Sequence, residues 1–548
     1  MAGDVVAREV RLAPGIREAW WHGLDLRRVA YRTTLVALIL IGAYFRSRRY
    51  WIDPLGLWVD EATWAIRLFR SSLTELEFRP IGYMALTKLI VRVYCDERTL
   101  RLLSYVAGLA SLPIAADISK YLFKSRLVRV LCVAVVAYNP LLIDMAREFK
   151  PYSVEFCVHL GLVWLFVRWR AKRSRAWLGA LLVCSVFAFP FAYNIVFLLP
   201  GLFMLLGYEL LRAQAYRALL ATICAAIAAA AVMATIYACA LRGTTQDSGG
   251  STEHFWGRKY DVFYLPNARQ PHRATARLRW LARKYCDLAA FPGIHGNPSR
   301  KGGFAVAETP SKLAEVGCYA WLLLHGLGLL ALFAYRRQWL LLLTGPLLVS
   351  IVFNALSLWP FGAFRSNVFL FTYLVLIPMV GLDVLLAAQV AIARIAGALG
   401  SGVLLVANLS SGFEPHTRKH FFAGQTEMTS LVTRMAAIRA EQPDKLRRHA
   451  TPVLLDSYSC APFRFEAAYN DSARRHFAQF LKDIDVSCMP SVSAAQKALR
   501  GSRGQPFFVV ASAERTISAY ARMLRTRTRV IAHEVIRNTD DLYFVTAR

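Results

Sequence analysis

Long uninterrupted apolar runs constrain the fold of this chain more than any other feature. Leu219–Ala240 and Trp339–Leu356 are two such runs, and neither contains a charged residue. A helix needs about 20 apolar residues to cross a hydrocarbon core about 30 Å thick. Inside lipid the backbone must satisfy its own hydrogen bonds, so each run is predicted to be a helix. A water-soluble all-helical protein would need a charged face on every helix, and these runs lack one. The chain is therefore predicted to be an integral membrane protein.

The charge pattern predicts how the spans are oriented. The formal net charge is +30, from 66 Lys and Arg against 36 Asp and Glu. The basic residues cluster between apolar runs, which is typical of cytoplasmic loops and not of a soluble nucleic-acid-binding face. We therefore expect a cytoplasmic N-terminus, contact with membrane lipids and no nucleic-acid partner. The clusters are Arg27, Arg28 and Arg32; Lys120, Lys124, Arg126 and Arg129; Arg168, Arg170, Lys172, Arg173 and Arg175; Arg212 and Arg217; and Arg336 and Arg337.

Eleven transmembrane helices fit this orientation, and an odd count places the C-terminus outside. Ala62–Phe69 and Ile81–Tyr94 are predicted to be amphipathic helices lying in the membrane interface. Treating Ile81–Tyr94 as a span instead would reverse every later span. The predicted spans are Val29–Phe45, Leu102–Ser119, Leu127–Ile143, Val154–Val167, Trp177–Phe189, Ile195–Leu210, Leu219–Leu241, Leu313–Tyr335, Trp339–Leu356, Val368–Ala387 and Val390–Ala407. Arg46, Arg48 and Arg49 follow the first span on the outer side, against the positive-inside rule.

Composition divides the chain into two domains. Residues 1–412 form the predicted all-α polytopic membrane domain, with outer loops at 46–100 and 242–312. Residues 413–548 mix β-like and helical runs, which predicts a small extracytoplasmic α/β domain. Cys460 and Cys488 in this domain could pair in an oxidising compartment, although spacing alone does not decide it. The predicted strands are Pro452–Asp456, Phe507–Ala511, Arg529–Ile531 and Asp541–Thr546, and the predicted helices are Asp471–Ile484 and Ala513–Leu524.

Two adjacent acids follow the first span on the outer side. Asp60 and Glu61 are flanked by Trp58 and Trp64. A carboxylate here could accept the proton of an attacking hydroxyl. Because sequential residues point in different directions, one acid could serve the site while the other caps the helix expected to start at Ala62. Both could equally be helix caps, since acids favour helix N-termini.

Cations recur on the same predicted face of the membrane. Arg79 precedes Pro80 at a predicted helix N-terminus, a combination that suits a phosphate. An arginine snorkelling to the interface is the alternative explanation. The segment 146–153 adds Arg147 and Lys150, which could hold phosphate, and Glu148, although an ordinary polar turn would look the same. Arg365 either anchors a span at the headgroups or faces a lipid phosphate.

The outer loop at 242–312 contains a further polar group. His254, Trp256, Arg258 and Lys259 could belong to a segment that closes over a bound donor and excludes water. A solvated surface insertion explains the same residues. Asp483-Ile484-Asp485 matches the Asp-x-Asp pattern of metal-dependent transferases, but chance explains so short a match. We identify no metal or other cofactor, and a divalent metal stays possible.

The order of these motifs resembles the C-type glycosyltransferase superfamily (GT-C), in its branch of protein O-mannosyltransferases and lipid A aminoarabinose transferases. The residues that carry the resemblance are Asp60-Glu61-Ala62, Arg79-Pro80-Ile81-Gly82-Tyr83, Arg98-Thr99-Leu100-Arg101 and Arg147-Glu148-Phe149-Lys150-Pro151-Tyr152, followed loosely by Trp359–Arg365. In this family Arg79 stands where a lysine often sits. Arg147-Glu148-Phe149-Lys150 also departs from the usual Gln-Glu-Ala-Arg order.

The resemblance implies a polyprenyl-phosphate-linked sugar as donor and inversion at the anomeric carbon. It implies Asp60, with Glu61, as the base or acceptor-orienting carboxylate. Arg79, Arg147, Lys150 and Arg365 would bind the donor phosphate. The substrate pocket would include Glu148, Tyr83, Tyr152 and Arg101.

The expected function is therefore transfer of a sugar to an acceptor hydroxyl on a lipid, glycan or protein at the periplasmic face of a bacterial inner membrane. A transporter or flippase of a lipid-linked or anionic solute is the main alternative. It predicts ionisable residues deep in the spans. A non-catalytic scaffold, acting through the C-terminal domain, is a third possibility.

Overall fold

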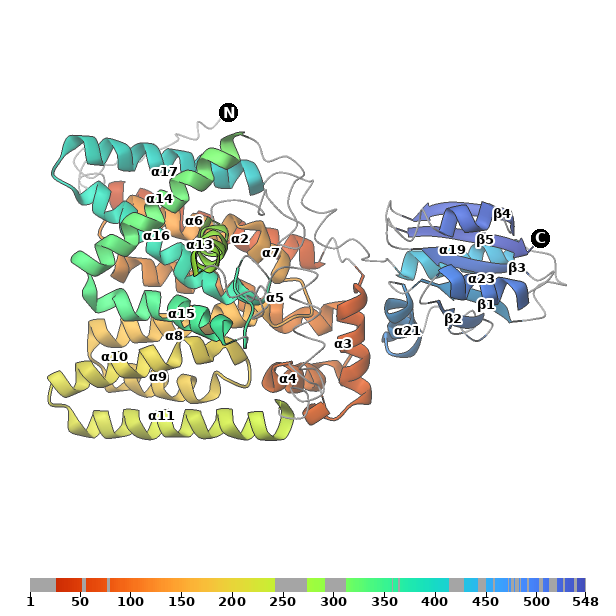
Figure 1. The fold of residues 1–548 in the computed structure, drawn as a ribbon, viewed down its shortest axis with the longest axis horizontal. Helices are drawn as coiled ribbons and strands as arrows, with labels where there is room; N and C mark the ends of the chain where they lie inside the picture. Colours follow the sequence, from red (N-terminus) through yellow and green to blue (C-terminus); the bar gives the residue numbers. More distant parts are fainter. Residues whose placement is uncertain are drawn as a thin grey trace, which may run out of the picture.

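The computed structural model shows a bundle of long helices with a small sheet domain beside one end of it (Figure 1). It describes residues 26–51, 56–75, 79–241, 274–290, 312–356, 358–362, 365–412, 428–441, 450–456, 459–471, 473–474, 478, 482, 484–489, 492–501, 506–511, 520–525, 528–536 and 540–547. The predicted combination of a helical membrane domain and a small C-terminal α/β domain is what these residues form.

A helix occupies each of the predicted spans. In the described residues, five helices are long and apolar enough to cross a membrane by length and composition. The count of eleven spans therefore stays a prediction. The bundle helices are α2 (Leu26–Trp51), α5 (Glu97–Leu122), α6 (Arg126–Tyr138), α7 (Pro140–Met145), α8 (Tyr152–Lys172), α9 (Arg175–Phe187), α10 (Leu199–Arg212), α11 (Tyr216–Ile236), α14 (Lys312–Ala334), α15 (Arg337–Ala355), α16 (Phe371–Ala387) and α17 (Ala391–Gly412).

Shorter elements connect these helices. The amphipathic segments form α3 (Val59–Arg70) and α4 (Ile81–Val91), and α3 runs across the ends of the long helices (Figure 1). The outer loop contains α13 (Ala274–Ala290), and short turns of helix form η1 (Leu73–Glu75), η2 (Tyr193–Phe197), η3 (Tyr237–Leu241) and η5 (Arg365–Leu370). The predicted span Leu127–Ile143 is broken between α6 and α7, because Pro140 begins a new helix whose N-terminus Asn139 caps.

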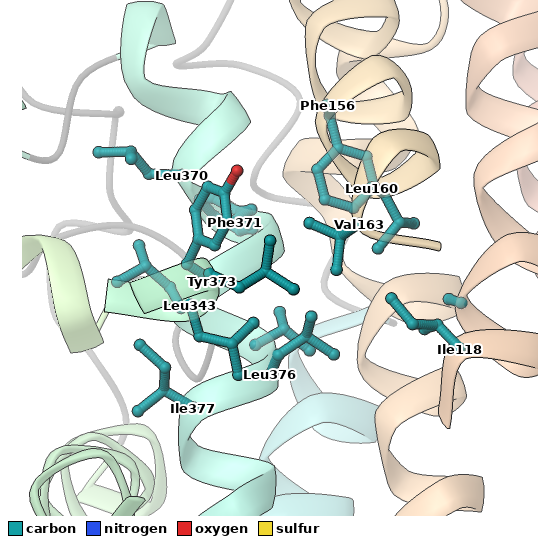
Figure 2. Close-up of a cluster of buried hydrophobic side chains, with 14 of the residues drawn as sticks. Ile118, Phe156, Leu160, Val163, Leu343, Leu370, Phe371, Tyr373, Leu376 and Ile377 are labelled. Atoms are coloured by element: carbon teal, nitrogen blue, oxygen red, sulfur yellow. The ribbon is translucent and has the colours of Figure 1, made fainter. Parts of the chain in front are cut away.

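The centre of the bundle is packed tightly enough for two backbones to touch. A Cβ atom on Gly328 of α14 would lie 2.0 Å from the carbonyl oxygen of Ile377, and one on Gly381 of α16 would lie 2.4 Å from that of Leu324. Small residues allow such close helix contact in membranes, where van der Waals packing drives association. Around α16, Phe156 and Leu160 of α8 and Leu343 of α15 complete a buried apolar cluster (Figure 2).

Charged residues in the bundle gather at its ends. At the end away from α3, Asp117 of α5 accepts hydrogen bonds from Trp164 Nε1 and Arg168 Nε of α8. Asp383 of α16 likewise accepts from Arg336 and from two backbone N–H groups of the loop before α6. Pairing of this kind makes charge tolerable near lipid.

Arg46 has a structural role that explains its exception to the positive-inside rule. It is buried near the end of α2, and its guanidinium donates to the carbonyl oxygens of Gly42, Val136 and Ala137. Two of these carbonyls belong to the last turn of α6, whose dipole favours a cation there. Arg46 is therefore fixed by the helix packing and carries little information about membrane orientation.

The C-terminal domain is a five-stranded mixed sheet with the order β2-β1-β3-β5-β4. The strands are β1 (Thr451–Leu455), β2 (Ile484–Cys488), β3 (Pro506–Ala511), β4 (Thr528–Ile536) and β5 (Asp540–Ala547). Four of the strands were predicted; β2 begins at Ile484, the last residue of the predicted helix Asp471–Ile484, and was not among the predicted strands. Helices α19 (Met428–Ala440) and α21 (Cys460–Ala468) pack on one face, and α23 (Val492–Gly501) lies on the other. Cys460 and Cys488 form a disulfide that joins α21 to β2.

Helix α21 and the turn after it dock the C-terminal domain onto α3 and the start of α5. Phe465 is buried in the apolar cluster of α3 and α4, and Tyr469 stacks on Phe69 with ring centroids 4.6 Å apart. Arg70 Nε donates to the Tyr469 hydroxyl at 3.0 Å. Cys95 and Asp471 exchange two hydrogen bonds, each 2.9 Å long. We call these contacts the docking seam.

Two carboxyl groups meet inside the docking seam. Glu466 is buried within electrostatic reach of Glu97. Burial raises the pKa of Glu466 well above its ordinary value of 4.5, and the carboxylates of Glu97 and Asp96 raise it further. Asn470, which donates to Glu97 at 3.2 Å, partly offsets these effects.

The docking seam is therefore expected to loosen as pH rises. The docked state holds a proton on Glu466 that the undocked state releases. The equilibrium constant for docking therefore falls by about tenfold for each pH unit above the ordinary pKa of a glutamate. A Glu466→Gln variant has no carboxyl group to titrate at this position and should lose this dependence. Hydrogen–deuterium exchange of residues 460–471 in the full-length protein, at about pH 5 and about pH 8, measures it. Glu441→Gln, on an exposed side chain, is the control. The same pH dependence in Glu466→Gln would contradict the assignment.

Candidate functional site

Glu61 connects three separate parts of the chain at the end of the bundle near α3. It is fully buried, and Arg101 of α5 donates to its two carboxylate oxygens at 3.2 and 2.7 Å. The backbone N–H of Phe149 donates to Glu61 as well, and that of Trp58 does so at 3.3 Å. Arg101 also donates to the carbonyl oxygen of Gly56 at 3.0 Å. A carboxylate with this many donors holds α3, α5 and the turn at 146–151 together.

Asp60, the neighbour of Glu61 in the first turn of α3, lies on a different face of the helix. It is half-buried, whereas Ala65 and Leu68, one and two turns after Glu61, are fully buried in the core. Residues four apart share a helix face, so Asp60 shares its face with Trp64. The two adjacent acids thus lie on different faces of α3: Glu61 is held by Arg101 and Phe149, and Asp60 is on the helix face of Trp64.

Trp64 has two cations over its ring. Lys150 Nζ lies 3.7 Å from the ring centroid and Arg79 Cζ lies 4.7 Å from it. Lys150 is also 5.3 Å from the ring of Trp58, and both cations are buried. The sequence predicted both cations for the site, and the structure brings them together from α4 and the turn at 146–151.

The backbone of Lys150 is fixed by a chain of hydroxyl groups. Ser104 of α5 donates to the carbonyl oxygen of Lys150 at 2.7 Å, and its hydroxyl is 3.2 Å from that of Tyr83 in α4. The ring of Tyr83 stacks on Phe149 with centroids 5.9 Å apart. Burial raises the pKa of Tyr83, and the carboxylates of Glu61 and Glu148 raise it further. Tyr83 therefore stays a neutral donor that supports the turn.

The structure places the remaining predicted residues around this arrangement or outside the described residues. Arg147 pairs with Asp144 at 3.1 Å, and both are buried. Glu148 is buried within electrostatic reach of Arg101 and Tyr83. Tyr152 begins α8 and is half-buried. Arg365 begins η5, but its side chain lies outside the described residues, as do His254, Trp256, Arg258 and Lys259.

The N-terminus of α4 is occupied by the protein itself. Tyr193 Oη accepts from the N–H of Ile81 at 3.1 Å, and the carbonyl oxygen of Pro190 accepts from that of Gly82 at 2.7 Å. A Cβ atom on Gly82 would lie 2.9 Å from Pro190 Cβ, so only glycine allows this approach. The predicted phosphate site at this helix N-terminus is therefore reduced to the Arg79 side chain.

The structure is similar to that of ArnT from Cupriavidus metallidurans. Two ArnT structures, one in the apo state and one bound to undecaprenyl phosphate, each align with a TM-score of 0.48 and 12% sequence identity. Each alignment covers 94% of this chain and 98% of ArnT. No family model and no curated protein matches the chain.

Sequence reasoning missed the residues that support the cations. Trp64 is visible only as a tryptophan near two acids, and nothing in the sequence links it to Arg79 or Lys150. Ser104 and Tyr193 are ordinary residues of apolar segments. Their contacts connect residues 46 and 112 positions apart, which only the folded chain brings together.

Proposed function

We propose that the protein is a membrane glycosyltransferase that moves a sugar from a polyprenyl phosphate to an acceptor hydroxyl at the outer face of the membrane. The observation that carries this proposal is the position of Asp60, which is half-buried and shares a face of α3 with Trp64. Lys150 and Arg79 contact the ring of that tryptophan. Such a transfer needs a base for the acceptor and cations for the leaving phosphate.

The reaction would be a single displacement. The acceptor oxygen attacks the anomeric carbon while the bond between that carbon and the phosphate oxygen breaks. Asp60 takes the hydroxyl proton, and the phosphate leaves with the bonding electron pair beside Arg79 and Lys150. Attack opposite the leaving group inverts the anomeric configuration. Glu61 acts in this scheme by positioning the turn at 146–151, in place of the catalytic role that the resemblance implies.

The C-terminal domain supports the proposed side of the membrane. Its disulfide between Cys460 and Cys488 is of a kind that persists in oxidising compartments such as the bacterial periplasm. This domain docks on α3, at the end of the bundle that carries the site. We therefore propose a periplasmic site and C-terminal domain in a bacterial inner membrane.

A buried polar group gives the transporter alternative one point of support. Glu155 and His159 are buried on α8, and the His159 ring nitrogens lie 2.8 Å from Tyr373 Oη and 3.2 Å from Asn194 Oδ1. Ionisable residues inside a span are a functional hypothesis by default. They lie in the N-terminal half of α8, the helix that follows the turn of Lys150, and Tyr373 belongs to the buried cluster around α16 (Figure 2).

One assay separates the two functions. The full-length protein in nanodiscs is given undecaprenyl-phosphate-linked sugar and detergent extract of bacterial envelope as the source of acceptor, with no ion gradient. A transferase releases undecaprenyl phosphate and labels the acceptor, and mass spectrometry detects both products. A transporter moves labelled lipid across a vesicle without breaking the sugar–phosphate bond. Movement with an intact bond would overturn the proposal.

Lys150→Met should weaken binding of the donor. It removes one charge-assisted contact to phosphate and keeps most of the side-chain volume, so we expect KM for the donor to rise about tenfold or more. Lys88→Met, on a lysine of α4 that donates to the carbonyl oxygen of Ser71, is the control. An unchanged KM in the Lys150 variant would remove this residue from the phosphate site.

A further inference from the structure

We propose that Glu155 and Asn194 form a subsite that binds one hydroxyl group of the sugar carried by the donor. The proposal rests on the proposed function and concerns recognition of the sugar itself. Glu155 lies in the first turn of α8 and is 6% exposed, and Asn194 of η2 is buried as well. Glu155 forms no ion pair with any residue that the structure describes. A buried carboxyl group without a cation is costly inside a membrane and indicates a function.

A chain of hydrogen bonds determines which group Asn194 can offer to a ligand. An amide oxygen only accepts, so His159 Nε2, which lies 3.2 Å from Asn194 Oδ1, carries the ring proton. His159 Nδ1 then accepts from the hydroxyl group of Tyr373 at 2.8 Å. The oxygen of Asn194 is thereby bonded to His159, and its Nδ2 amino group is the donor that the residue can present.

This amino group and the carboxyl group of Glu155 have complementary requirements. Asn194 Nδ2 is buried and has no hydrogen-bond partner in the described part of the chain. The side chain of Asn194 is also close enough to influence the carboxyl group of Glu155. A carboxylate has about four lone-pair positions, more than one amide can fill.

A hydroxyl group satisfies both residues at once. Its proton is donated to the carboxylate of Glu155, and its oxygen accepts from Asn194 Nδ2, whose burial without a partner is otherwise unfavourable. A metal ion or an ammonium group has no lone pair with which to accept from Nδ2. The pair therefore favours a hydroxyl ligand over the cation that a transporter would carry.

The subsite lies next to the two segments that carry the proposed phosphate-binding cations. The N–H of Glu155 donates to the carbonyl oxygen of Pro151 at 2.8 Å, so Glu155 is one helical turn from the turn at 146–151. Tyr193 of η2 accepts from the N–H of Ile81 at 3.1 Å, at the start of α4. A sugar is joined directly to its phosphate, so a phosphate held by these two segments brings the sugar to this part of the bundle.

The test measures how tightly the full-length protein in nanodiscs binds undecaprenyl phosphate with and without an attached sugar. The probes carry glucose, galactose, mannose or xylose, and the unmodified protein should bind at least one of them more tightly than the bare lipid. Glu155→Gln keeps the size of the side chain and removes the charged acceptor. It should therefore reduce this preference about tenfold or more, because hydrogen bonds to charged groups are the strong ones. Binding of bare undecaprenyl phosphate should not change.

Two further variants keep the test decisive. Asn194→Leu removes the donor and should also reduce the preference, so it decides the question if thermal unfolding shows that Glu155→Gln is not folded. Glu209→Gln is the matched control, because Glu209 pairs at 3.0 Å with Arg170 in the last turn of α8, at the other end of the same helix. The control should keep the full preference.

Three results would overturn the proposal. One is an unchanged preference in a folded Glu155→Gln variant, and another is an unmodified protein that binds every sugar-bearing lipid no more tightly than the bare one. The third is a proton or sodium current in proteoliposomes that Glu155→Gln abolishes, which would assign the pair to transport. Lys150→Met tests the proposed function separately, because it should weaken binding of bare and sugar-bearing lipid alike. If it weakens neither, the phosphate site fails, and the two failures are thus distinguishable.

Discussion

Replacing Asp60 by asparagine is expected to lower the turnover of sugar transfer at least 100-fold while the protein stays folded. Asparagine has the same shape but does not accept the proton of the acceptor hydroxyl, and a positioned general base contributes about 10²–10⁴-fold. Donor binding should change little, because the cations over Trp64 are untouched. Transfer is measured in nanodiscs at saturating donor, and undecaprenyl phosphate binding is measured on the same sample.

Two results would count against this role for Asp60. Turnover equal to that of the unmodified protein would remove Asp60 from the chemistry. A loss of folding together with activity would indicate that Asp60 is a helix cap, because acids stabilise the first turn of a helix. Glu75→Gln, in the exposed η1 turn beyond the same helix, is the control for a general effect of removing negative charge.

Replacing Arg101 by methionine is expected to cost about 3–5 kcal/mol of stability, because it leaves the Glu61 carboxylate buried without its partner. The hydrogen bonds of Arg101 include two to Glu61 and one to Gly56. Its loss also frees Glu61 from the arrangement that holds the turn of Lys150. We therefore expect transfer to fall together with the unfolding temperature. An Arg101→Lys variant should lose less stability than Arg101→Met but still some, because lysine does not make the bidentate contact with Glu61.

A double variant separates the charge from the packing. In Glu61→Met with Arg101→Met, neither charge of this ion pair remains, and apolar replacements of ion pairs are often neutral or stabilising. Stability should therefore recover most of the loss seen in Arg101→Met, while transfer stays low because the N–H of Phe149 has lost its acceptor. An unfolding temperature in Arg101→Met equal to that of the original protein would contradict this account.

The helices were predictable because their signal is local. A run such as Leu219–Leu241 must become a helix in lipid whatever surrounds it. Boundaries were less predictable: Asn139 and Pro140 divide one expected span, because the Asn139 side chain caps a second helix inside a continuous apolar run. Strand β2 starts at the last residue of the predicted helix 471–484 and was not among the predicted strands.

The candidate site was predictable as a set of charges and not as an arrangement. Asp60, Arg79 and Lys150 were found because charged residues beside apolar runs are conspicuous. The division of labour between Asp60 and Glu61 was left open, since it depends on Arg101 and on the backbone of Phe149, 88 residues further along the chain. Trp64 could not be assigned, because an aromatic residue in an amphipathic helix is most often part of a core.

The docking seam has a consequence for how the protein is made. Cys95 and Asp471, which meet in it, are 376 residues apart. In a chain synthesised from its N-terminus, α3 and the start of α5 are in place long before α21 exists. The side of α3 that Phe465 and Tyr469 cover then stays uncovered until the last quarter of the chain has been made. A polypeptide that stops short of this quarter would carry an uncovered apolar strip, the kind of feature that chaperones and proteases recognise in unfinished proteins.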